Sequence, residues 1–499
     1  MRDHIRLLIN GRQHDVRGRG VFATLSNYLR YDFGATGTKI VCEEGDCGAC
    51  SVLIRKSSAA SASGTNSADE FLPINSCILS MFQLDGASIV TVEGLKLNAV
   101  QQAMIECHGA QCGYCTPGFV VAMTGLFETR ARVDEKCARE GLVGNLCRCT
   151  GYEPIIKAAC AVDGSSMKRM RESYPETIDD NDEVLIEEEG RTFFAPASLD
   201  EALTFKRKFK PCTIVQGATD VGVWINKRSY AATAMMSLAK LRELNDLRED
   251  DGAIVAGANV TLTQFENFTR DRIPELHHIL NIFGSPQIKN AGTLVGNIAN
   301  GSPIGDTLPY LFVSGATLEL ASVDGTRTVA VSDFYRGYKQ FDLEPHEIIT
   351  RVRVPIMPAC HPERSPRSPA TSDQRAHAED SASSARRGMT GDFLRLYKVS
   401  RRRDLDISAF TAAILLRVSN MHIEQATIAY GGVAPVVMRL PKTESYLAGK
   451  SIASDTFEEA GRIARGEVAP ISDVRGSRDY RLQLAENILM KFYYDELAS

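Results

Sequence analysis

The chain has 499 residues, 44% of them hydrophobic, so it is long enough to fold into about three domains. Its net charge is −5 with acids and bases interspersed, and residues 401–403 form its one tight basic run, which does not favour a nucleic-acid partner. No apolar run approaches the roughly 18 residues of a membrane span, and residues 1–13 are typical of a short strand rather than a signal peptide. We therefore expect a cytoplasmic protein that binds neither nucleic acid nor membrane.

The thirteen cysteines are unevenly distributed along the chain. Eleven precede residue 161, and only Cys212 and Cys360 follow. In a reducing compartment, a cysteine-dense segment indicates metal or redox chemistry more often than disulfides. The first third of the chain is thus expected to bind metal, and the remainder to do something else.

The first cysteine set lies among short elements near the N-terminus. A hairpin is predicted at residues 5–16 with a turn at Asn10-Gly11, followed by a short helix at 23–30 and a strand at 51–55. Cys42, Cys47 and Cys50 have the C-x4-C-x2-C spacing of plant-type 2Fe–2S ferredoxins, with Cys77 as a fourth thiolate. Gly45 and Gly48 would let the loop fold over a cluster. A zinc site is the alternative, although this spacing with glycines suits it less well.

The second cysteine set combines a C-x2-C pair with a C-x-C pair. Cys112 and Cys115 are separated from Cys147 and Cys149 by 31 residues, and helices are predicted at 117–130 and 153–162. Spacing alone leaves both a cluster and a zinc ion open. The other five cysteines (Cys107, Cys137, Cys160, Cys212 and Cys360) match no ligand position and are expected to be core or surface residues.

Two later segments indicate a different chemistry. Residues 213–226 predict a strand, a turn at Gly217–Asp220 that could point backbone N–H groups at a pyrophosphate, and then a second strand or a helix. Taken alone, a plain β-turn is the better interpretation. Residues 283–306 are dense in Gly, Asn, Ser and Thr, and they predict loops with many backbone donors between apolar strands.

Three polar stretches mark the organisation of the chain. Residues 163–183 are predicted to be a linker. Residues 57–70 and 359–388 have almost no apolar content, so we expect them to be mobile surface insertions.

Three motifs carry a family resemblance. "GDCGAC" (45–50), "QCGYCTPG" (111–118) and "GNLCRCTGY" (144–152) resemble the iron–sulfur part of the molybdenum hydroxylases. The resemblance implies two 2Fe–2S clusters, the first held by Cys42, Cys47, Cys50 and Cys77 and the second by Cys112, Cys115, Cys147 and Cys149. It also implies that Gln111 faces the pterin of a molybdenum cofactor in a neighbouring domain or subunit.

The later segments resemble the FAD domain of the same family. Carried over position by position, the resemblance implies FAD contacts at Ile214, Val215, Gln216, Gly217, Ala218, Thr219, Asp220, Val221, Phe283, Thr293, Leu294, Val295, Gly296, Asn297, Asp306, Ile349 and Lys398. Two positions depart from the family pattern. Ala218 stands where Gly or Asn is frequent, and Val295 stands where Gly is usual.

The resemblance implies an α+β fold in several domains. They are a ferredoxin-like β-grasp 2Fe–2S domain at 1–85, a four-helix 2Fe–2S domain at 86–165, a linker at 166–190, a two-lobed FAD-binding domain of the vanillyl-alcohol-oxidase-like type at 191–358, a disordered insertion at 359–390 and a small C-terminal α/β domain at 391–499.

This domain order, with no molybdopterin region after the flavoprotein part, resembles the small subunit of two-subunit bacterial xanthine dehydrogenases. It implies a large molybdenum-binding partner in an (αβ)2 heterotetramer, no catalytic residue in this chain, and electron transfer through two 2Fe–2S clusters to FAD and NAD⁺ during hydroxylation of hypoxanthine and xanthine to urate. The alternatives are a subunit of an aldehyde-oxidase-like or other molybdenum hydroxylase, a stand-alone flavin reductase, and a non-enzymatic iron–sulfur or zinc scaffold.

Overall fold

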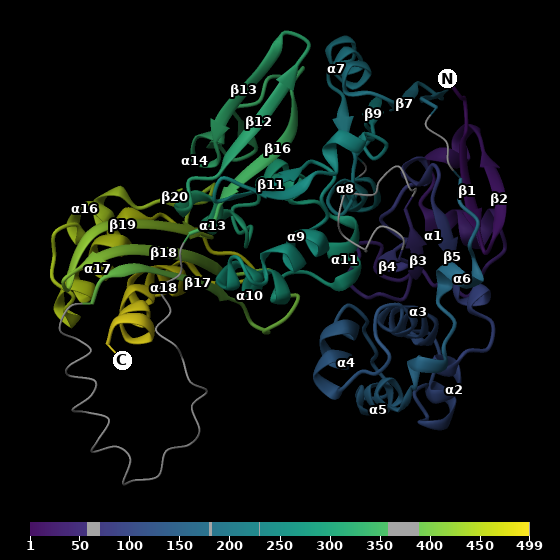
Figure 1. Ribbon diagram of the computed structural model, residues 1–499, viewed down its shortest axis with the longest axis horizontal. Helices are drawn as coiled ribbons and strands as arrows, with labels where there is room; N and C mark the ends of the chain where they lie inside the picture. The colour runs from purple at the N-terminus through teal and green to yellow at the C-terminus, as the bar shows by residue number, and fades with distance from the viewer. Residues whose placement is uncertain (57–69, 179–181, 229, 358–388, 499) are drawn as a thin grey trace.

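The computed structural model describes residues 1–56, 70–178, 182–228, 230–357 and 389–498, which form mixed helix and strand domains spread along one long axis (Figure 1). The two expected insertions lie outside the described residues except for their end residue Glu70, and so does Cys360. Among the described residues, no helix combines the length and the apolar character needed to cross a membrane.

The N-terminal part of the chain forms a five-stranded sheet. Its order is β2-β1-β5-β3-β4, with β1 parallel to β5 and the other pairs antiparallel. The strands are β1 (Ile5–Ile9), β2 (Arg12–Val16), β3 (Ser51–Arg55), β4 (Leu72–Asn75) and β5 (Ser88–Val90), and the short helix α1 is Leu25–Asn27. The predicted hairpin and the strand at 51–55 are confirmed.

Four helices follow and pack together below this sheet in Figure 1. They are α2 (Ala99–Glu106), α3 (Thr116–Phe127), α4 (Glu135–Leu142) and α5 (Glu153–Ala161). Their core includes Leu53 of β3 and Val90 of β5, so the helices and the sheet share buried surface. Beyond them, the segment expected to be a linker at 166–190 contains α6 (Met170–Ser173) and strand β6 (Val184–Glu188).

The strand β6 begins a second sheet, in the order β6-β7-β9-β8. Its remaining strands are β7 (Arg191–Ala195), β8 (Thr213–Ile214) and β9 (Ala234–Met236), accompanied by α7 (Leu199–Lys208) and α8 (Val221–Arg228). One continuous core joins this sheet to the N-terminal sheet, and the rings of Phe82 and Phe193 meet in it at 4.7 Å. The two sheets are therefore held together by buried apolar contact.

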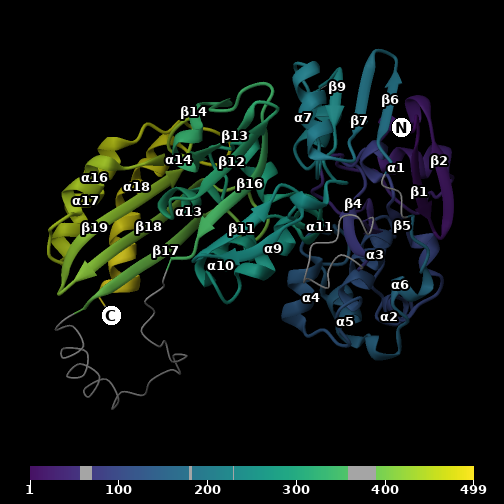
Figure 2. The same ribbon diagram turned by 45° about the horizontal axis from the view of Figure 1, so that its top comes forward.

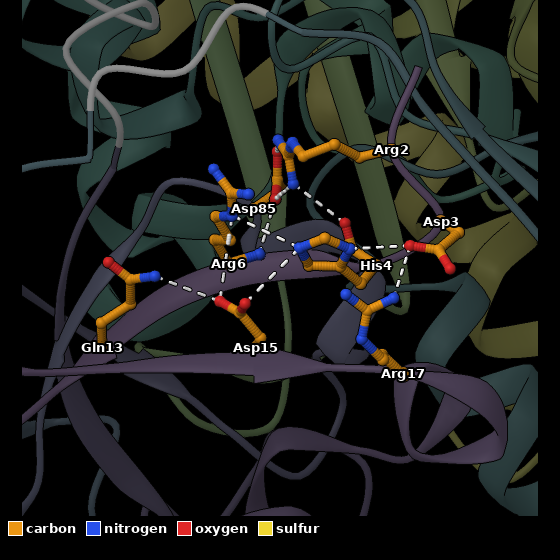
Figure 3. Close-up of polar contacts among 8 residues, drawn as sticks. All are labelled: Arg2, Asp3, His4, Arg6, Gln13, Asp15, Arg17 and Asp85. Carbon is orange, nitrogen blue, oxygen red and sulfur yellow. Dashed lines mark hydrogen bonds and ion pairs between the residues drawn. The ribbon is translucent and has the colours of Figure 1, made fainter.

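A polar contact between the same two parts of the chain centres on Asp85, whose bonds with Arg2 and Arg6 are drawn in Figure 3. Its carboxylate accepts hydrogen bonds from the Arg2 guanidinium at 3.1 and 2.8 Å and from the Arg6 backbone N–H, and it pairs with Lys240 at 2.5 Å. Burial acts to raise the pKa of Asp85, but the bonds from Arg2 and Lys240 outweigh it and hold that pKa below its ordinary value. Lys240 follows β9, so this contact joins the N-terminal domain to the next one.

The third sheet has the order β10-β11-β16-β12-β13 and is entirely antiparallel. Its strands are β10 (Leu247–Asp250), β11 (Ala253–Gly257), β12 (Thr317–Ser322), β13 (Gly325–Ala330) and β16 (Ile348–Pro355). The helices between them are α9 (Leu262–Thr269), α10 (Pro274–Ile282), α11 (Pro286–Ala291), α12 (Leu294–Asn300), α13 (Leu308–Val313) and α14 (Val331–Phe334), and a small hairpin is formed by β14 (Tyr335–Gly337) and β15 (Gln340–Phe341).

The C-terminal sheet has three helices on one side, as Figure 2 shows, and it contacts the preceding domain. Its order is β17 (Gly391–Val399), β18 (Phe410–Ser419), β19 (His422–Gly431) and β20 (Met438–Arg439). The covering helices on one side are α16 (Pro441–Leu447), α17 (Ser454–Glu467) and α18 (Arg478–Phe492), whereas α10 and α13 contact it from the preceding domain.

Candidate functional site

The first set of thiols is brought together by the loop before β3 and the turn after β4. Cys47 and Cys77 donate hydrogen bonds to Cys42, which lowers the pKa of the Cys42 thiol far below its ordinary value. Cys77 also donates to Cys50, and Cys50 and Cys77 are only 1% and 2% exposed. The thiols thus form the pairs Cys42–Cys47 and Cys50–Cys77, and the contact between Cys42 and Cys77 joins the two pairs.

The loop conformation fits a cluster between those thiols. Gly45 and Gly48 adopt left-handed φ angles of 82° and 67°, and the Asn75 side chain donates to the Gly45 carbonyl at 2.6 Å. A Cβ on Gly45 would lie 2.9 Å from the side chains of both Ile78 and Ile288. The glycines therefore let the chain turn tightly around the thiols, as a 2Fe–2S site requires.

The second set of thiols converges in two pairs. Cys112 is hydrogen-bonded to Cys149, and Cys115 to Cys147. Burial and the Cys147 contact raise the pKa of the Cys115 thiol to about 12. This arrangement of the four thiols in two pairs fits a 2Fe–2S cluster, in which two thiolates bind each iron. Within the described residues, no group of three or more Cys, His, Asp or Glu side chains surrounds a single ion position.

The two sets differ in their exposure. Cys112 and Cys149 are exposed, and so is Gln111. Beside them, Tyr114 is 52% and Leu146 is 44% exposed. The second set therefore reaches the protein surface, whereas Cys50 and Cys77 of the first set are buried.

A cavity of about 1180 Å³ lies next to the first set. This volume exceeds the range of about 300–1,000 Å³ that is typical of ligand pockets, so it fits a long ligand. Its wall is built from all three of the domains that meet here: Glu44, Gly45 and Asp46 of the first thiol loop, the flavin-like segments, and Leu405, Ile407 and Arg481 of the C-terminal domain.

Most of the residues expected at FAD lie on this wall. They are Ile214, Gln216, Gly217, Ala218, Thr219, Asp220, Val221, Phe283, Thr293, Val295, Gly296, Asn297, Asp306 and Ile349. Three do not. Val215 and Leu294 are 1% and 0% exposed and belong to hydrophobic cores. Lys398 instead donates to Asp306 at 2.7 Å and to Ser408 at 2.7 Å, behind the wall.

The turn at 217–220 owes its shape to two small residues. A Cβ on Gly217 would lie 2.2 Å from the Ala291 carbonyl oxygen, so no larger residue fits there. Ala218 has a φ of 53°, a left-handed conformation that costs an alanine about 1–2 kcal/mol and that Gly or Asn adopts more readily. The turn leads directly into α8, and the helix N-terminus favours a negatively charged group.

The segment at 283–306 differs from the expected loops between strands. It contains the two short helices α11 and α12, and it lies between helices α10 and α13. The Ser285 hydroxyl accepts from the Ile288 N–H, and the Thr293 hydroxyl accepts from the Gly296 N–H. These hydroxyl caps, and Pro286 in the first turn of α11, are local signals for the start of a helix, although the polar composition of the segment favours loops.

Several wall residues are not among those that the family resemblance places at FAD. Glu44 and Asp46 lie in the first thiol loop, whereas Ile407 and Arg481 lie in the C-terminal domain. Arg481 is nearly fully buried and donates to the Ala409 carbonyl at 3.0 Å. A buried arginine in α18 gives no signal in the sequence, because only the folded C-terminal domain brings it to the cavity.

The arrangement agrees with the comparisons with known domains. Residues 91–160 match a 2Fe–2S binding domain, residues 188–357 match the FAD binding domain in molybdopterin dehydrogenase, and residues 395–495 match the CO dehydrogenase flavoprotein C-terminal domain. The chain therefore contains 2Fe–2S and FAD-binding domains.

The chain is also similar to xanthine dehydrogenases along most of its length. It is 28% identical to that of Drosophila pseudoobscura pseudoobscura over 97% of this chain, and 26% identical to xanthine dehydrogenase 1 of Arabidopsis thaliana over 98%. The chain spans only 38% and 39% of those two relatives.

Solved structures give a consistent picture of the fold. The crystal structure of quinoline 2-oxidoreductase from Pseudomonas putida 86 matches with a TM-score of 0.51 and 25% identity, covering 60% of this chain and 94% of that one. A cyanide-inactivated Cu,Mo-CO dehydrogenase matches with the same TM-score and coverage at 24% identity, and it shows the fold alone. The chain is thus similar in its iron–sulfur and FAD-binding domains to proteins named xanthine dehydrogenase, and its flavoprotein part is similar in fold to quinoline 2-oxidoreductase.

Proposed function

We propose that this chain is the electron-transfer subunit of a xanthine dehydrogenase. In this function it passes electrons from a molybdenum site in a partner chain through two 2Fe–2S clusters to FAD and then to NAD⁺. When bound, the clusters carry electrons singly and FAD combines them into the pair that NAD⁺ accepts. The chain itself supplies the thiolates, the FAD cavity and the distances between them.

One observation carries the proposal: the two thiol sets have different surroundings. The first thiol loop contributes Glu44, Gly45 and Asp46 to the wall of the large cavity that also holds Phe283. The second set opens to the surface at Cys112 and Cys149. The two thiol sets therefore form a series that begins at the protein surface and ends at the flavin cavity. Electron transfer from a donor in a separate chain requires such a series.

The same surface supports a protein partner. Gln111, Tyr114 and Leu146 are exposed around the second set. Exposed apolar side chains next to a redox group are typical of a docking face. We place the molybdopterin and the hydroxylation of hypoxanthine or xanthine in that partner, and we propose an (αβ)2 assembly. We propose xanthine as the substrate because the relatives that align over 97–98% of this chain are named xanthine dehydrogenases.

The experiment isolates the chain from its native source and identifies what purifies with it. We expect a molybdenum- and pterin-containing chain, about four irons, and one FAD. The complex should form NADH from xanthine, and the isolated chain should exchange electrons between NADH and a dye but should not oxidise xanthine. Oxidation of quinoline or an aldehyde in place of xanthine would reassign the substrate, and purification without any molybdenum partner would favour a stand-alone flavin reductase.

A further inference from the structure

The two loops that carry the thiol sets touch through their main chains. The Leu146 N–H, directly before Cys147, donates to the Cys47 carbonyl at 3.0 Å. A Cβ on Gly48 would lie 2.3 Å from the Gly144 carbonyl oxygen, and a Cβ on Gly118 would lie 2.3 Å from the Gly48 carbonyl oxygen. The loops are therefore in direct backbone contact, which any side chain at these glycines would break.

Asn145 fixes this contact from one side. Its side-chain amide donates to the Gly48 carbonyl at 3.0 Å, and Asn145 is only 2% exposed. Its own Oδ1 accepts a hydrogen bond from Gln287 Nε2 at 2.8 Å. Because Gln287 donates to the oxygen, the nitrogen of the Asn145 amide is the atom directed at Gly48.

Gln287 comes from a different domain and makes few other hydrogen bonds. It lies on α11 of the FAD-binding domain, is 0% exposed, and otherwise donates only a long 3.4 Å bond to Ser51. Its Oε1 is buried without a hydrogen-bond partner in the part of the chain that the structure describes. Burying an unsatisfied acceptor destabilises the fold, so packing alone does not account for a glutamine at this position.

We propose that Gln287 is a positioning residue for electron transfer between the two clusters. It holds Asn145 on the Gly48 carbonyl, and thereby holds the Leu146–Cys47 hydrogen bond that connects one ligand loop to the other. This bond gives the route from Cys47 to Cys147 a continuous path through bonds instead of a jump through space. The proposal rests on the proposed function, in which both thiol sets hold a 2Fe–2S cluster.

The test compares two buried amides on the same helix. Gln287→Met keeps the length of the side chain and removes the donor. The control is Asn290→Leu, because Asn290 is 6% exposed and donates across the same domain boundary to the Pro73 carbonyl at 2.9 Å, away from both ligand loops. The bound FAD is reduced by light with EDTA, samples are freeze-quenched, and the two cluster signals are followed separately by electron paramagnetic resonance.

In Gln287→Met we expect the first cluster to be reduced at the wild-type rate. Reduction of the second cluster should be delayed about 10- to 100-fold, which is the effect that a displacement of about 1 Å can have. The magnetic coupling between the two reduced clusters should also change. Asn290→Leu should match the wild type in both readouts. In the Asn145→Ala background, Gln287→Met should add no further delay, because the two residues act as one unit.

Wild-type timing in Gln287→Met, or an equal delay in Asn290→Leu, would overturn the proposal. If Gln287→Met loses a cluster, Gln287→Glu, which keeps the shape but does not donate when ionised, is measured in the same way. A wild-type protein without two cluster signals would refute the proposed function instead, so the two failures are distinguishable.

Discussion

Asn226 of α8 donates its side-chain amide to the carbonyl oxygen of Cys77 at 2.8 Å. The same amide donates to the Glu43 carbonyl at 2.9 Å, on the other segment that supplies ligands of the first set. One side chain of the FAD-binding domain thus ties together the two segments that must converge on the first cluster.

Replacing this asparagine should weaken the first site selectively. Asn226→Leu removes two hydrogen bonds, each worth about 0.5–1.5 kcal/mol, so the free energy of unfolding should fall by about 1–3 kcal/mol. A redox titration followed by electron paramagnetic resonance should show a shifted midpoint for one cluster and an unchanged midpoint for the other. Asn267→Leu, at an exposed asparagine on α9, is the control. Equal shifts of both clusters would contradict this account.

The cysteine assignment makes a prediction about metal content. Eight thiolates in two sets imply about four irons and matching acid-labile sulfide per chain. Cys149→Ala should reduce this to about two irons and abolish one paramagnetic signal, because Cys149 is paired with Cys112. Cys160→Ala, also at an exposed cysteine, should change neither quantity. Zinc without sulfide in the wild-type protein would refute the assignment of both sets.

The sequence was most informative where structure depends on neighbours along the chain. The hairpin of β1 and β2 follows from alternating apolar residues and the Asn10-Gly11 turn, and both ends of β3 lie where predicted. The helices α11 and α12 differ from the predicted loops. Their local capping signals, Ser285-Pro286 and Thr293, prevail over the glycine and asparagine content of the segment.

Contacts between domains could not be predicted in this way. Asn226, Gln287 and Asp85 look like ordinary polar residues, and their partners are 79 to 236 positions away in the chain. The cavity wall is likewise assembled from three domains, so sequence motifs found only the part contributed by the FAD-like segments. Lys398, which the family resemblance implies as a neighbour of FAD, forms a buried ion pair with the cavity residue Asp306, because an unpaired buried carboxylate would be costly.

Glu128, at the end of α3, should make stability depend on pH near neutrality. Burial raises its pKa to about 7, although the Met170 N–H, which donates at 3.0 Å, opposes this shift. The folded pKa exceeds the unfolded value of about 4.3, so the folded protein holds an extra proton between these values and loses stability as pH rises through them.

Glu128→Gln keeps an acceptor oxygen for Met170 without the charge. From pH 6 to pH 8 the wild type should lose about 1 kcal/mol of unfolding free energy relative to this variant, and above pH 8 the difference should be constant. Denaturant unfolding at a series of pH values measures it. For Glu172→Gln, at an exposed glutamate on α6, the free energy of unfolding should change with pH in the same way as for the wild type. A parallel curve for Glu128→Gln would show that the carboxylate is solvated.

The close approach of α8 to the first thiol set gives a final prediction. A Cβ on Gly222 would lie 2.0 Å from the carbonyl oxygen of Ile78 and 2.8 Å from its carbonyl carbon. Both atoms belong to the backbone next to Cys77, so a methyl group can be accommodated only if α8 moves away. Gly222→Ala should therefore reduce the free energy of unfolding by about 1–3 kcal/mol, despite the better helix propensity of alanine.

The displacement should also lower FAD content, because Asp220 and Val221 at the start of α8 line the cavity. Flavin absorbance per chain and denaturant unfolding measure the two effects. Gly466→Ala is the matched control: Gly466 lies in α17 with no atom within 4 Å of the added Cβ, so this change should be neutral or stabilise by up to about 1 kcal/mol. If Gly222→Ala behaves like Gly466→Ala in both measurements, α8 does not pack against the Cys77 turn in solution.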